Sequence, residues 1–152
     1  MSYQPRGRYF EDFKVGETFV SQARTINPAD VSNFAGVTAD FNPLHTDEEF
    51  AKKTPFGSRV AHGLLTLGIS GGQQNLMGLF EGTSLALLGL DKVRFTAPVR
   101  FGDTIHTELT VKETKESSKP DRGVVVLDTV VKNQRGETVL QFEQAVLFKR
   151  RK

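Results

Sequence analysis

The chain contains no cysteine among its 152 residues, so it has no disulfide bonds and no thiolate metal ligands. It also lacks a long apolar run, because its longest apolar stretch, residues 63–79, is interrupted by Gln73, Gln74 and Asn75. A membrane-spanning helix needs roughly 20 predominantly apolar residues, so we expect none. The polar and charged first 13 residues lack the apolar segment of a signal peptide, and we therefore expect a cytoplasmic protein.

Strong charge of one sign is also missing, since 20 Lys and Arg residues face 18 Asp and Glu residues and the net charge is +2. This balance, without interleaved aromatic and basic residues, disfavours nucleic acid as a partner. The basic end, residues 149–152, is expected to be a solvated tail rather than a phosphate site. The sequence has no glycine-rich phosphate loop and no serine in the turn motif of serine hydrolases, which disfavours both classes.

The length fits one domain, and no repeat or linker divides the chain, so we expect a single domain over residues 1–152. The second half is rich in Val, Thr, Phe and Leu between turn-like segments, which predicts antiparallel strands with short connections. The predicted strands cover residues 85–101, 104–115, 123–133 and 138–149, with one more near 18–25. With the helices of the first half, this pattern predicts an α+β fold with a sheet packed on one long helix.

Three helix starts are expected in the first half of the chain. Asn27 and Pro28 predict the first, because Asn caps free N–H groups and Pro suits the first helical position. Thr46 and Glu49 have the spacing of a capping box and predict the second. Residues 62–79 predict a longer helix that is apolar on all sides and therefore buried.

Glycines within the long helix carry a further expectation. Gly68, Gly71 and Gly72 each lower helix stability by roughly 1 kcal/mol relative to Ala. Their presence predicts that another backbone approaches the helix closely, as a sheet wrapped around it would.

A dense group of polar residues lies between the first two helix starts. Asp40, Asn42 and His45 fall within six residues, in a segment that Pro43 should hold as a structured loop. Such residues are often purely structural, because Asp and Asn form turns and His is commonly hydrogen-bonded. A carboxylate beside an imidazole also suits the activation of a water near neutral pH. The density favours this second interpretation, in which Asn42 either orients the water or fixes the loop.

His62 and Gly63 begin the predicted long helix. Its first N–H groups have no internal partner and carry partial positive charge, so the Gly63 N–H is a candidate donor to a developing oxyanion. The alternative is that Gly63 only permits close packing. We expect His62 to be a helix-start or packing residue rather than a base. No metal site is expected, because Asp40, His45 and His62 lack the spacing of ligands on one helix face.

Three blocks of the sequence carry a family resemblance. They are FAGVTADFNPLH at residues 34–45, VAHGLL at 60–65 and VRFTAPVRFGD at 93–103. In this order they resemble the MaoC-like (R)-specific enoyl-CoA hydratases, also called hydratase 2. The acid-Asn-Pro-His segment is the specific part, whereas the Gly-Asp turn is shared with many hotdog proteins. Ala39 departs from the pattern, in which glycine is common, and is unfavourable if the position needs a positive φ.

The resemblance implies a hotdog fold and a homodimer with active sites at or near the subunit interface, and it leaves a higher oligomer open. It implies that the enzyme hydrates trans-2-enoyl-CoA to (R)-3-hydroxyacyl-CoA, reversibly and without a cofactor. Asp40 and His45 would form the catalytic dyad, Asn42 the supporting amide, and the Gly63 N–H the site for the thioester oxygen. The acid and base roles within the dyad stay undivided, because a coupled pair shares its titration.

Residues that would bind the acyl-CoA are less well marked. His62, Arg59, Arg94 and Arg100 lie in or near the three blocks. The arginines, with Lys92, are candidates for the CoA phosphates, and the alternative for each is a solvated surface position. Phe56, Met77 and Phe80 could line an acyl tunnel and are equally good core residues. Two alternatives remain open: a hotdog acyl-CoA thioesterase and a non-catalytic subunit that binds acyl thioesters.

Overall fold

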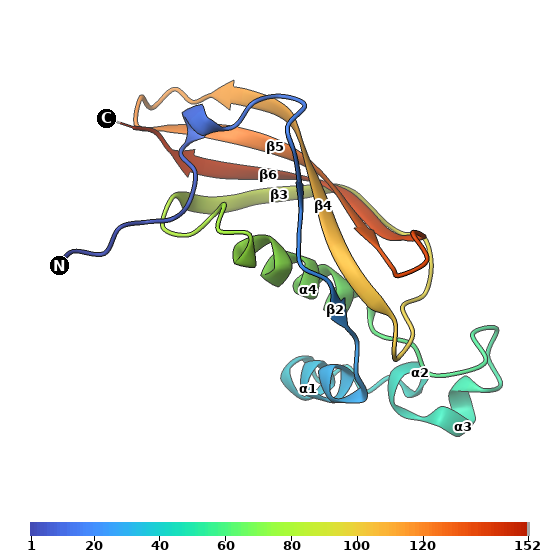
Figure 1. Cartoon of the computed structure of the whole chain (residues 1–152). Coiled ribbons are helices and arrows are strands. Elements are labelled where there is room, and N and C mark those ends of the chain that lie inside the picture. The colour runs from blue at the N-terminus through green and yellow to red at the C-terminus, as the bar shows by residue number, and fades with distance from the viewer. Residues whose placement is uncertain (152) are drawn as a thin grey trace.

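The computed structural model describes residues 1–151 as an α+β fold (Figure 1). Its elements, in chain order, are η1 (Phe10–Asp12), β1 (Thr18–Val20), β2 (Arg24–Thr25), α1 (Pro28–Thr38), α2 (Pro43–Thr46), α3 (Glu48–Ala51), α4 (Gly63–Leu76), β3 (Ser84–Phe95), β4 (Thr104–Glu116), β5 (Arg122–Lys132) and β6 (Thr138–Lys149). Within residues 1–151, no helix has the length and apolar character needed to span a bilayer. The cytoplasmic location stays a prediction.

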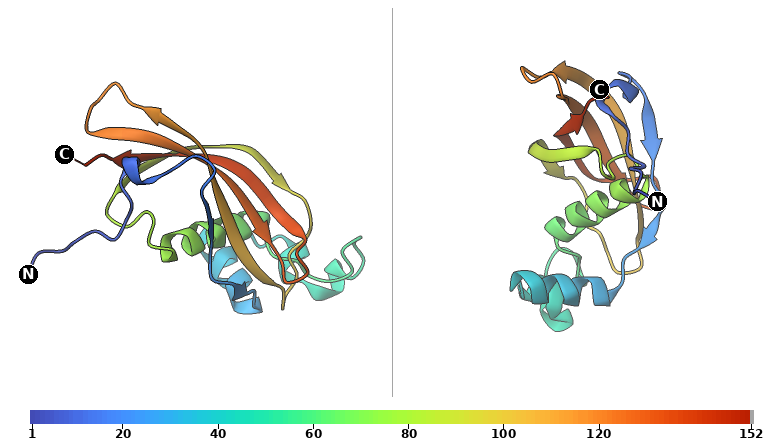
Figure 2. Two further views of the ribbon diagram at one scale, coloured as in Figure 1. Left: turned by 45° about the horizontal axis from the view of Figure 1, so that its top comes forward. Right: turned by 90° about the vertical axis from the view of Figure 1, so that its left-hand side faces the viewer.

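The strands form one antiparallel sheet in the order β1-β4-β5-β6-β3, and β2 pairs with the far end of β4. The sheet curves over α4, while α1, α2 and α3 lie together at one end of it (Figures 1 and 2). This confirms the predicted sheet on a long helix, which is the hotdog arrangement. Strand β3 forms one edge of the sheet, and its residues are mostly exposed.

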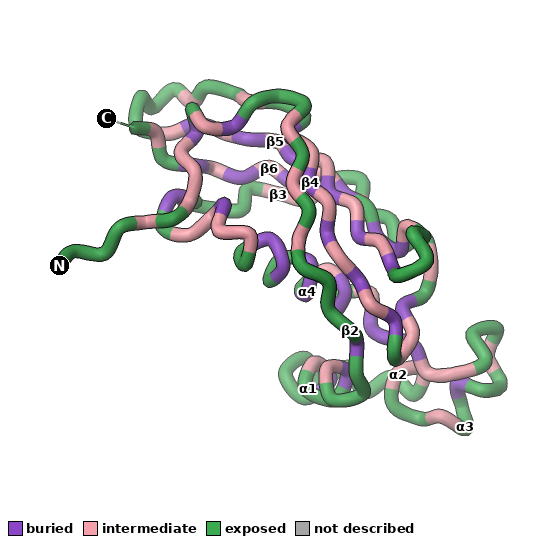
Figure 3. The backbone as a smooth tube through the Cα atoms, in the orientation of Figure 1, coloured by how far each residue is buried: buried purple, intermediate pink, exposed green. Residues whose placement is uncertain are grey.

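The alternating pattern of the second half creates the core. Every second residue of β5 is buried, and the buried positions, purple in Figure 3, lie on the strands and on α4. Leu65 and Ile69 of α4 pack with Val131, Val139 and other apolar residues of the sheet in one cluster. Burial of this kind contributes roughly 25 cal/mol per Å² of apolar surface, so the helix and sheet stabilise each other.

Polar side chains also meet in this interface, and they are hydrogen-bonded. The Gln73 amide donates to the Ile105 carbonyl at 2.8 Å and accepts from the Thr107 hydroxyl at 2.8 Å. Gln144, the polar exception on the inner face of β6, donates from Nε2 to Gln74 Oε1 at 2.5 Å. Since buried polar groups destabilise a fold when unpaired, these bonds specify how α4 sits on the sheet.

Two of the three predicted helix starts, at Asn27 and His62, are confirmed, and the third is corrected. Asn27 is the N-cap of α1, as predicted, and its N–H donates to the Asp30 carboxylate at 2.8 Å. Thr46 is not a helix start: it ends α2, and Asp47 caps α3 instead by accepting the Phe50 N–H at 3.0 Å. The reason is that the predicted loop around Pro43 itself forms a short helix, which shifts the next start by one residue.

The expectation for the three glycines of α4 was wrong. A Cβ added to Gly68, Gly71 or Gly72 would meet no atom within 4 Å. The sheet packs on the opposite side of α4, through Leu65 and Ile69, so it does not require these glycines.

The predicted strand 85–101 was too long, since β3 ends at Phe95. Pro98 lies in the missing part, and a proline has no N–H for a sheet ladder. The single strand expected near 18–25 is two short strands, β1 and β2, separated by residues 21–23.

The Gly-Asp turn before β4 is stabilised by a buried carboxylate. Gly102 has a φ of 88°, and Asp103 is only 4% exposed. The Asp103 carboxylate accepts the Arg100 N–H at 2.8 Å, the Gln134 amide at 2.8 Å and Arg135 Nη1 at 3.1 Å. Burial by itself raises the pKa of the Asp103 carboxyl, but these hydrogen bonds and the charge of Arg135 outweigh it. The pKa therefore lies below its ordinary value.

Candidate active site

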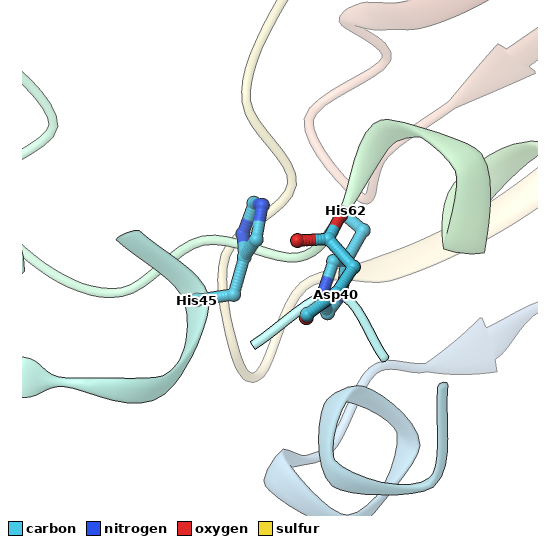
Figure 4. Close-up of side chains that lie close together, drawn as sticks. All are labelled: Asp40, His45 and His62. Carbon is cyan, nitrogen blue, oxygen red and sulfur yellow. Dashed lines mark hydrogen bonds between the residues drawn. The ribbon is translucent and has the colours of Figure 1, made fainter. Parts of the chain in front are cut away.

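Three side chains from different segments meet beside the first turn of α4. Asp40 follows α1, His45 lies on α2, and His62 is the N-cap of α4 (Figure 4). One carboxylate or ring-nitrogen atom from each lies within 4.8 Å of the others. The structure thus brings the two dyad candidates together and adds His62, which the sequence had suggested as a packing residue.

The segment that carries Asp40 leaves α1 through a left-handed residue. Ala39 has φ 61° and ψ 16°, so this position does require a positive φ. The turn places Asp40 in an exposed position, where its N–H donates to Thr38 Oγ1 and its Oδ1 accepts the Asn42 N–H, both at 3.3 Å. Asn42 is the N-cap of α2, with its Oδ1 accepting the Leu44 N–H at 3.0 Å. Its side chain therefore fixes the loop.

The His45 ring is held by a backbone carbonyl. Its Nδ1 lies 2.8 Å from the Val60 oxygen, and because a carbonyl can only accept, Nδ1 carries the proton. In the neutral ring Nε2 then presents a lone pair, which is what a general base needs. In Figure 4 the Asp40 carboxylate is directed toward this ring.

His62 lies behind the dyad and is only 2% exposed. Its Nε2 lies 2.9 Å from the Asp40 backbone oxygen, so Nε2 carries the proton and donates it. Its ring stacks on the His45 ring with centroids 3.9 Å apart and planes inclined by 35°. Within residues 1–151, the buried His62 Nδ1 has no hydrogen-bond partner.

The three groups do not have the geometry of a metal site. The His45 and His62 rings lie against each other, with centroids 3.9 Å apart and planes inclined by 35°, whereas the ligands of one ion converge on it. One nitrogen of each ring also donates to a carbonyl, and the remaining His62 Nδ1 is enclosed by protein. The cluster suits proton transfer better than metal binding.

A cavity of about 590 Å³ opens beside His45 and the start of α4. Its lining is mainly apolar and comprises Leu44, His45, Phe56, Val60, Ala61, Gly63, Leu64, Thr66, Phe95, Thr96, Ala97, Pro98, Val99 and Val139. Gly63 lines it as the first residue of α4, and a Cβ there would lie 2.9 Å from the Phe95 ring. Glycine thus allows Phe95 to approach, and it leaves the helix N-terminus bordering the cavity.

The three candidate arginines differ in what they contact. Arg59 Nε donates to the Glu48 carboxylate at 2.9 Å, and Arg100 Nη1 donates to Ser58 Oγ at 2.6 Å. Both therefore shape the segment that precedes α4. Arg94 is exposed, and within residues 1–151 its one side-chain hydrogen bond is to the carbonyl of the preceding residue.

The aromatic and methionine candidates for the acyl tunnel are divided by the structure. Phe56 lines the cavity, but Met77 and Phe80 pack in a second core cluster with Phe148. They lie at the other end of α4, and of the two alternatives given for them the core role is the one observed. The third histidine, His106, lies on β4 and hydrogen-bonds Glu108 at 3.0 Å on the outer face of the sheet.

Comparison with known proteins identifies the family to which the chain belongs. The MaoC-like domain family matches residues 12–134. A 3-hydroxybutyryl-CoA dehydratase of Methylorubrum extorquens is 41% identical over 109 residues, which cover 69% of this chain and 64% of that protein. An (R)-specific enoyl-CoA hydratase of Rhodospirillum rubrum is 39% identical over 107 residues, which cover 68% of this chain and 69% of that protein.

A solved structure extends the similarity to nearly the whole chain. The MaoC-like dehydratase of Rhodospirillum rubrum superposes with a TM-score of 0.86 at 33% identity, covering 96% of this chain and 99% of its own. The chain therefore belongs to the MaoC-like domain family and has the hotdog fold.

Proposed function

We propose that the protein adds water to a trans-2-enoyl-CoA to give an (R)-3-hydroxyacyl-CoA, and that it catalyses the reverse dehydration. The observation that carries this proposal is the pairing of an exposed Asp40 carboxylate with His45 at an apolar cavity. The names of the dehydratase and the hydratase that match this chain support it.

The reaction needs a group to activate water, a proton donor to C2 and a site for negative charge. The thioester carbonyl polarises the conjugated double bond, so a water held by Asp40 and His45 adds its oxygen to C3. The proton lost from this water reaches the dyad, and the dyad delivers a proton to C2. The Gly63 N–H, at the positive end of α4, stabilises the enolate-like oxygen. Nothing is oxidised or reduced, so no cofactor is required.

Substrate binding divides between the cavity and the surface around it. The apolar lining, including Leu64 and Phe95, binds the acyl group, because binding removes the apolar surfaces of the acyl chain and of the cavity from water. The phosphates of CoA stay outside the cavity. Of the three candidate arginines, Arg94 makes no side-chain bond to another segment of the described chain, whereas Arg59 and Arg100 shape the segment that precedes α4. His62 acts on the dyad rather than on the substrate.

We also propose that the enzyme is a homodimer joined through β3 and the glycine face of α4. An unpaired edge strand with apolar side chains is prone to pair with another chain. Leu85, Leu87 and Leu88 of β3 are between 42% and 59% exposed, and Gly68 and Gly72 of α4 leave open space beside them. Light scattering should give twice the chain mass, and L87K should give the mass of one chain. A monomeric wild-type protein would refute this arrangement.

The hydration is tested with purified protein and crotonyl-CoA, by following the loss of enoyl-thioester absorbance and using a thiol reagent as a second channel. Removing the general base should lower the rate about 10²- to 10⁴-fold, so D40N and H45Q should both lose activity. Matched controls are D128N and H106Q, which change an Asp and a His on the outer face of the sheet and should keep activity.

Each outcome of this assay distinguishes between functions. Absorbance loss without thiol release, abolished by D40N, supports the hydratase. Thiol release identifies a thioesterase, in which water attacks the carbonyl carbon. If crotonyl-CoA and longer enoyl-CoAs bind but show neither change, the protein is a non-catalytic subunit for acyl thioesters.

A further inference from the structure

We infer that His62 is a positioning residue that fixes the Asp40 carboxylate relative to the His45 imidazole and the Gly63 N–H. This inference rests on the proposed hydration, because it assigns a role within that site. His62 is buried and lies outside the lining of the cavity, so it would act through its neighbours.

The first contact holds Asp40. His62 Nε2 donates to the Asp40 backbone oxygen at 2.9 Å, although the two residues are 22 positions apart. The other hydrogen bonds of Asp40 are at 3.3 Å, to the exposed residues Thr38 and Asn42. Among the residues that the structure describes, His62 is thus the only buried group hydrogen-bonded to Asp40. It links the exposed turn that carries the carboxylate to the core.

The second contact holds His45. The two rings stack with centroids 3.9 Å apart, while Phe34 of α1 packs on His62 with a centroid distance of 4.8 Å. The bond from His45 Nδ1 to Val60 fixes rotation about the side chain, and the stack fixes the plane of the ring. The position and the direction of His45 Nε2 are therefore both fixed.

The third link is covalent. His62 is the N-cap of α4 and directly precedes Gly63, the proposed oxyanion donor. A single buried residue therefore touches the carboxylate segment, the imidazole and the start of the helix. A shift of about 1 Å between such groups can lower a rate about 100-fold, so their spacing matters for the reaction.

The unpaired Nδ1 argues against a role in packing alone. A buried polar atom without a partner is destabilising, and an apolar ring of similar size would avoid this penalty. A phenylalanine would fill the space and stack equally well, but it could not donate to Asp40. The histidine is explained if the Nε2–H is required.

The test compares H62F, which keeps a ring without a donor, with H62Q. The glutamine Nε2 is the same number of bonds from Cβ as the histidine Nε2, so it can restore the donor. With crotonyl-CoA we expect H62F to lower kcat about 10- to 100-fold with little change in KM, and H62Q to recover most of kcat. H106Q is the control for loss of a histidine. A packing role predicts the reverse order, with H62F the more active variant, and this result would overturn the inference.

Two measurements do not need substrate. Long-range ¹H–¹⁵N spectra of the imidazoles should place the proton of His62 on Nε2 and that of His45 on Nδ1; a proton on His62 Nδ1 overturns the inference. Amide hydrogen exchange at Asn42, whose N–H donates to the Asp40 carboxylate, should be faster in H62F than in wild type and H62Q. If wild type does not hydrate any enoyl-CoA, the proposed function fails, and this exchange comparison decides the positioning role: equal exchange in H62F and wild type refutes it.

Discussion

Replacing Ala39 with glycine should stabilise the protein, although glycine normally weakens a chain. Ala39 has a φ of 61°, and the left-handed conformation costs an L-residue roughly 1–2 kcal/mol. Glycine removes this strain but makes the unfolded chain more flexible, which costs about 0.4–1 kcal/mol. Ala39 is exposed, so no packing is lost. The net expectation is a gain of about 0.5–1 kcal/mol in the free energy of unfolding.

The assay is thermal unfolding of A39G and of wild type under the same conditions. For a chain of this size, 1 kcal/mol shifts the midpoint by about 2–4 °C, so A39G should raise it by about 1–4 °C. The matched control is G36A within α1, the helix that Ala39 caps. Gly36 is exposed, does not have a positive φ, and an added Cβ there meets no atom within 4 Å. G36A should also stabilise, by about 0.5–1 kcal/mol, because alanine is the better helix residue.

A39G replaces alanine with glycine and G36A does the reverse, yet both should raise the free energy of unfolding. If helix propensity governed both positions, A39G would destabilise by about 1 kcal/mol while G36A stabilised. A lower midpoint for A39G would therefore refute the left-handed assignment at residue 39. Hydratase activity should survive in A39G, since the turn before Asp40 is retained.

Three further predictions concern the cavity, the interface between helix and sheet, and acid stability. G63A should lower kcat by about 100-fold, because the new Cβ would lie 2.9 Å from the Phe95 ring and displace it, which disturbs the site. The thermal midpoint should change little, since the Phe95 ring is exposed, and an unfolded G63A would contradict this. Q144L should lower the free energy of unfolding in urea by about 1–3 kcal/mol, because it removes the donor to the buried Gln74 Oε1. The double variant Q74L/Q144L should be more stable than the sum of the single changes predicts, and additivity would show that the pair does not interact. Asp103 has a lowered pKa, so its stabilising contribution is complete above its unfolded-state pKa and disappears as the pH falls through the folded-state pKa. The thermal midpoint of wild type should therefore fall below about pH 4 more steeply than that of D103N, and parallel curves would refute the linkage.

The sheet and the first helix could be predicted because their signals are local. Alternation along β5 and β6 follows from one face being buried, and Asn27 with Pro28 marks a helix start by cap chemistry alone. Signals that compete over one or two residues were less informative. Thr46 and Asp47 are both good caps, and the choice between them depended on a short helix around Pro43 that spacing did not reveal.

The open glycine face of α4 shows a different limit of prediction from sequence. Gly68 and its neighbours predicted a close approach by the sheet, but no atom of the described chain would lie within 4 Å of a Cβ added there. Glycine spacing alone does not identify what lies beside a helix. Met77 and Phe80 have the same limit, because an apolar residue near the end of a helix fits a core and a tunnel equally well. The answer depends on which end of the helix the cavity occupies.

The sequence predicted the pairing of Asp40 with His45, but it did not predict the contact of His62 with them. Asp40 and His45 are close in the chain, so their proximity in space was a fair inference. The bond from His62 to Asp40 spans 22 residues, and periodicity carries no information about it. The available signal was a polar residue at the start of a buried helix, where its side chain must find a partner or remain unsatisfied.

The placement of these groups explains how one fold can separate stability from chemistry. Asp40 follows the end of α1, His45 lies on the short α2, and Gly63 begins α4, so each functional group lies at or near a helix end rather than within the sheet. Helix ends leave backbone groups unpaired, which makes them available to substrate, whereas sheet residues use theirs in the ladder. The sheet fixes α4 through buried apolar and amide contacts, and in the role we infer for it His62 connects α4 to Asp40 and His45. It follows that substitutions at the sheet interface should change the free energy of unfolding more than kcat, and that substitutions at His62 should do the opposite.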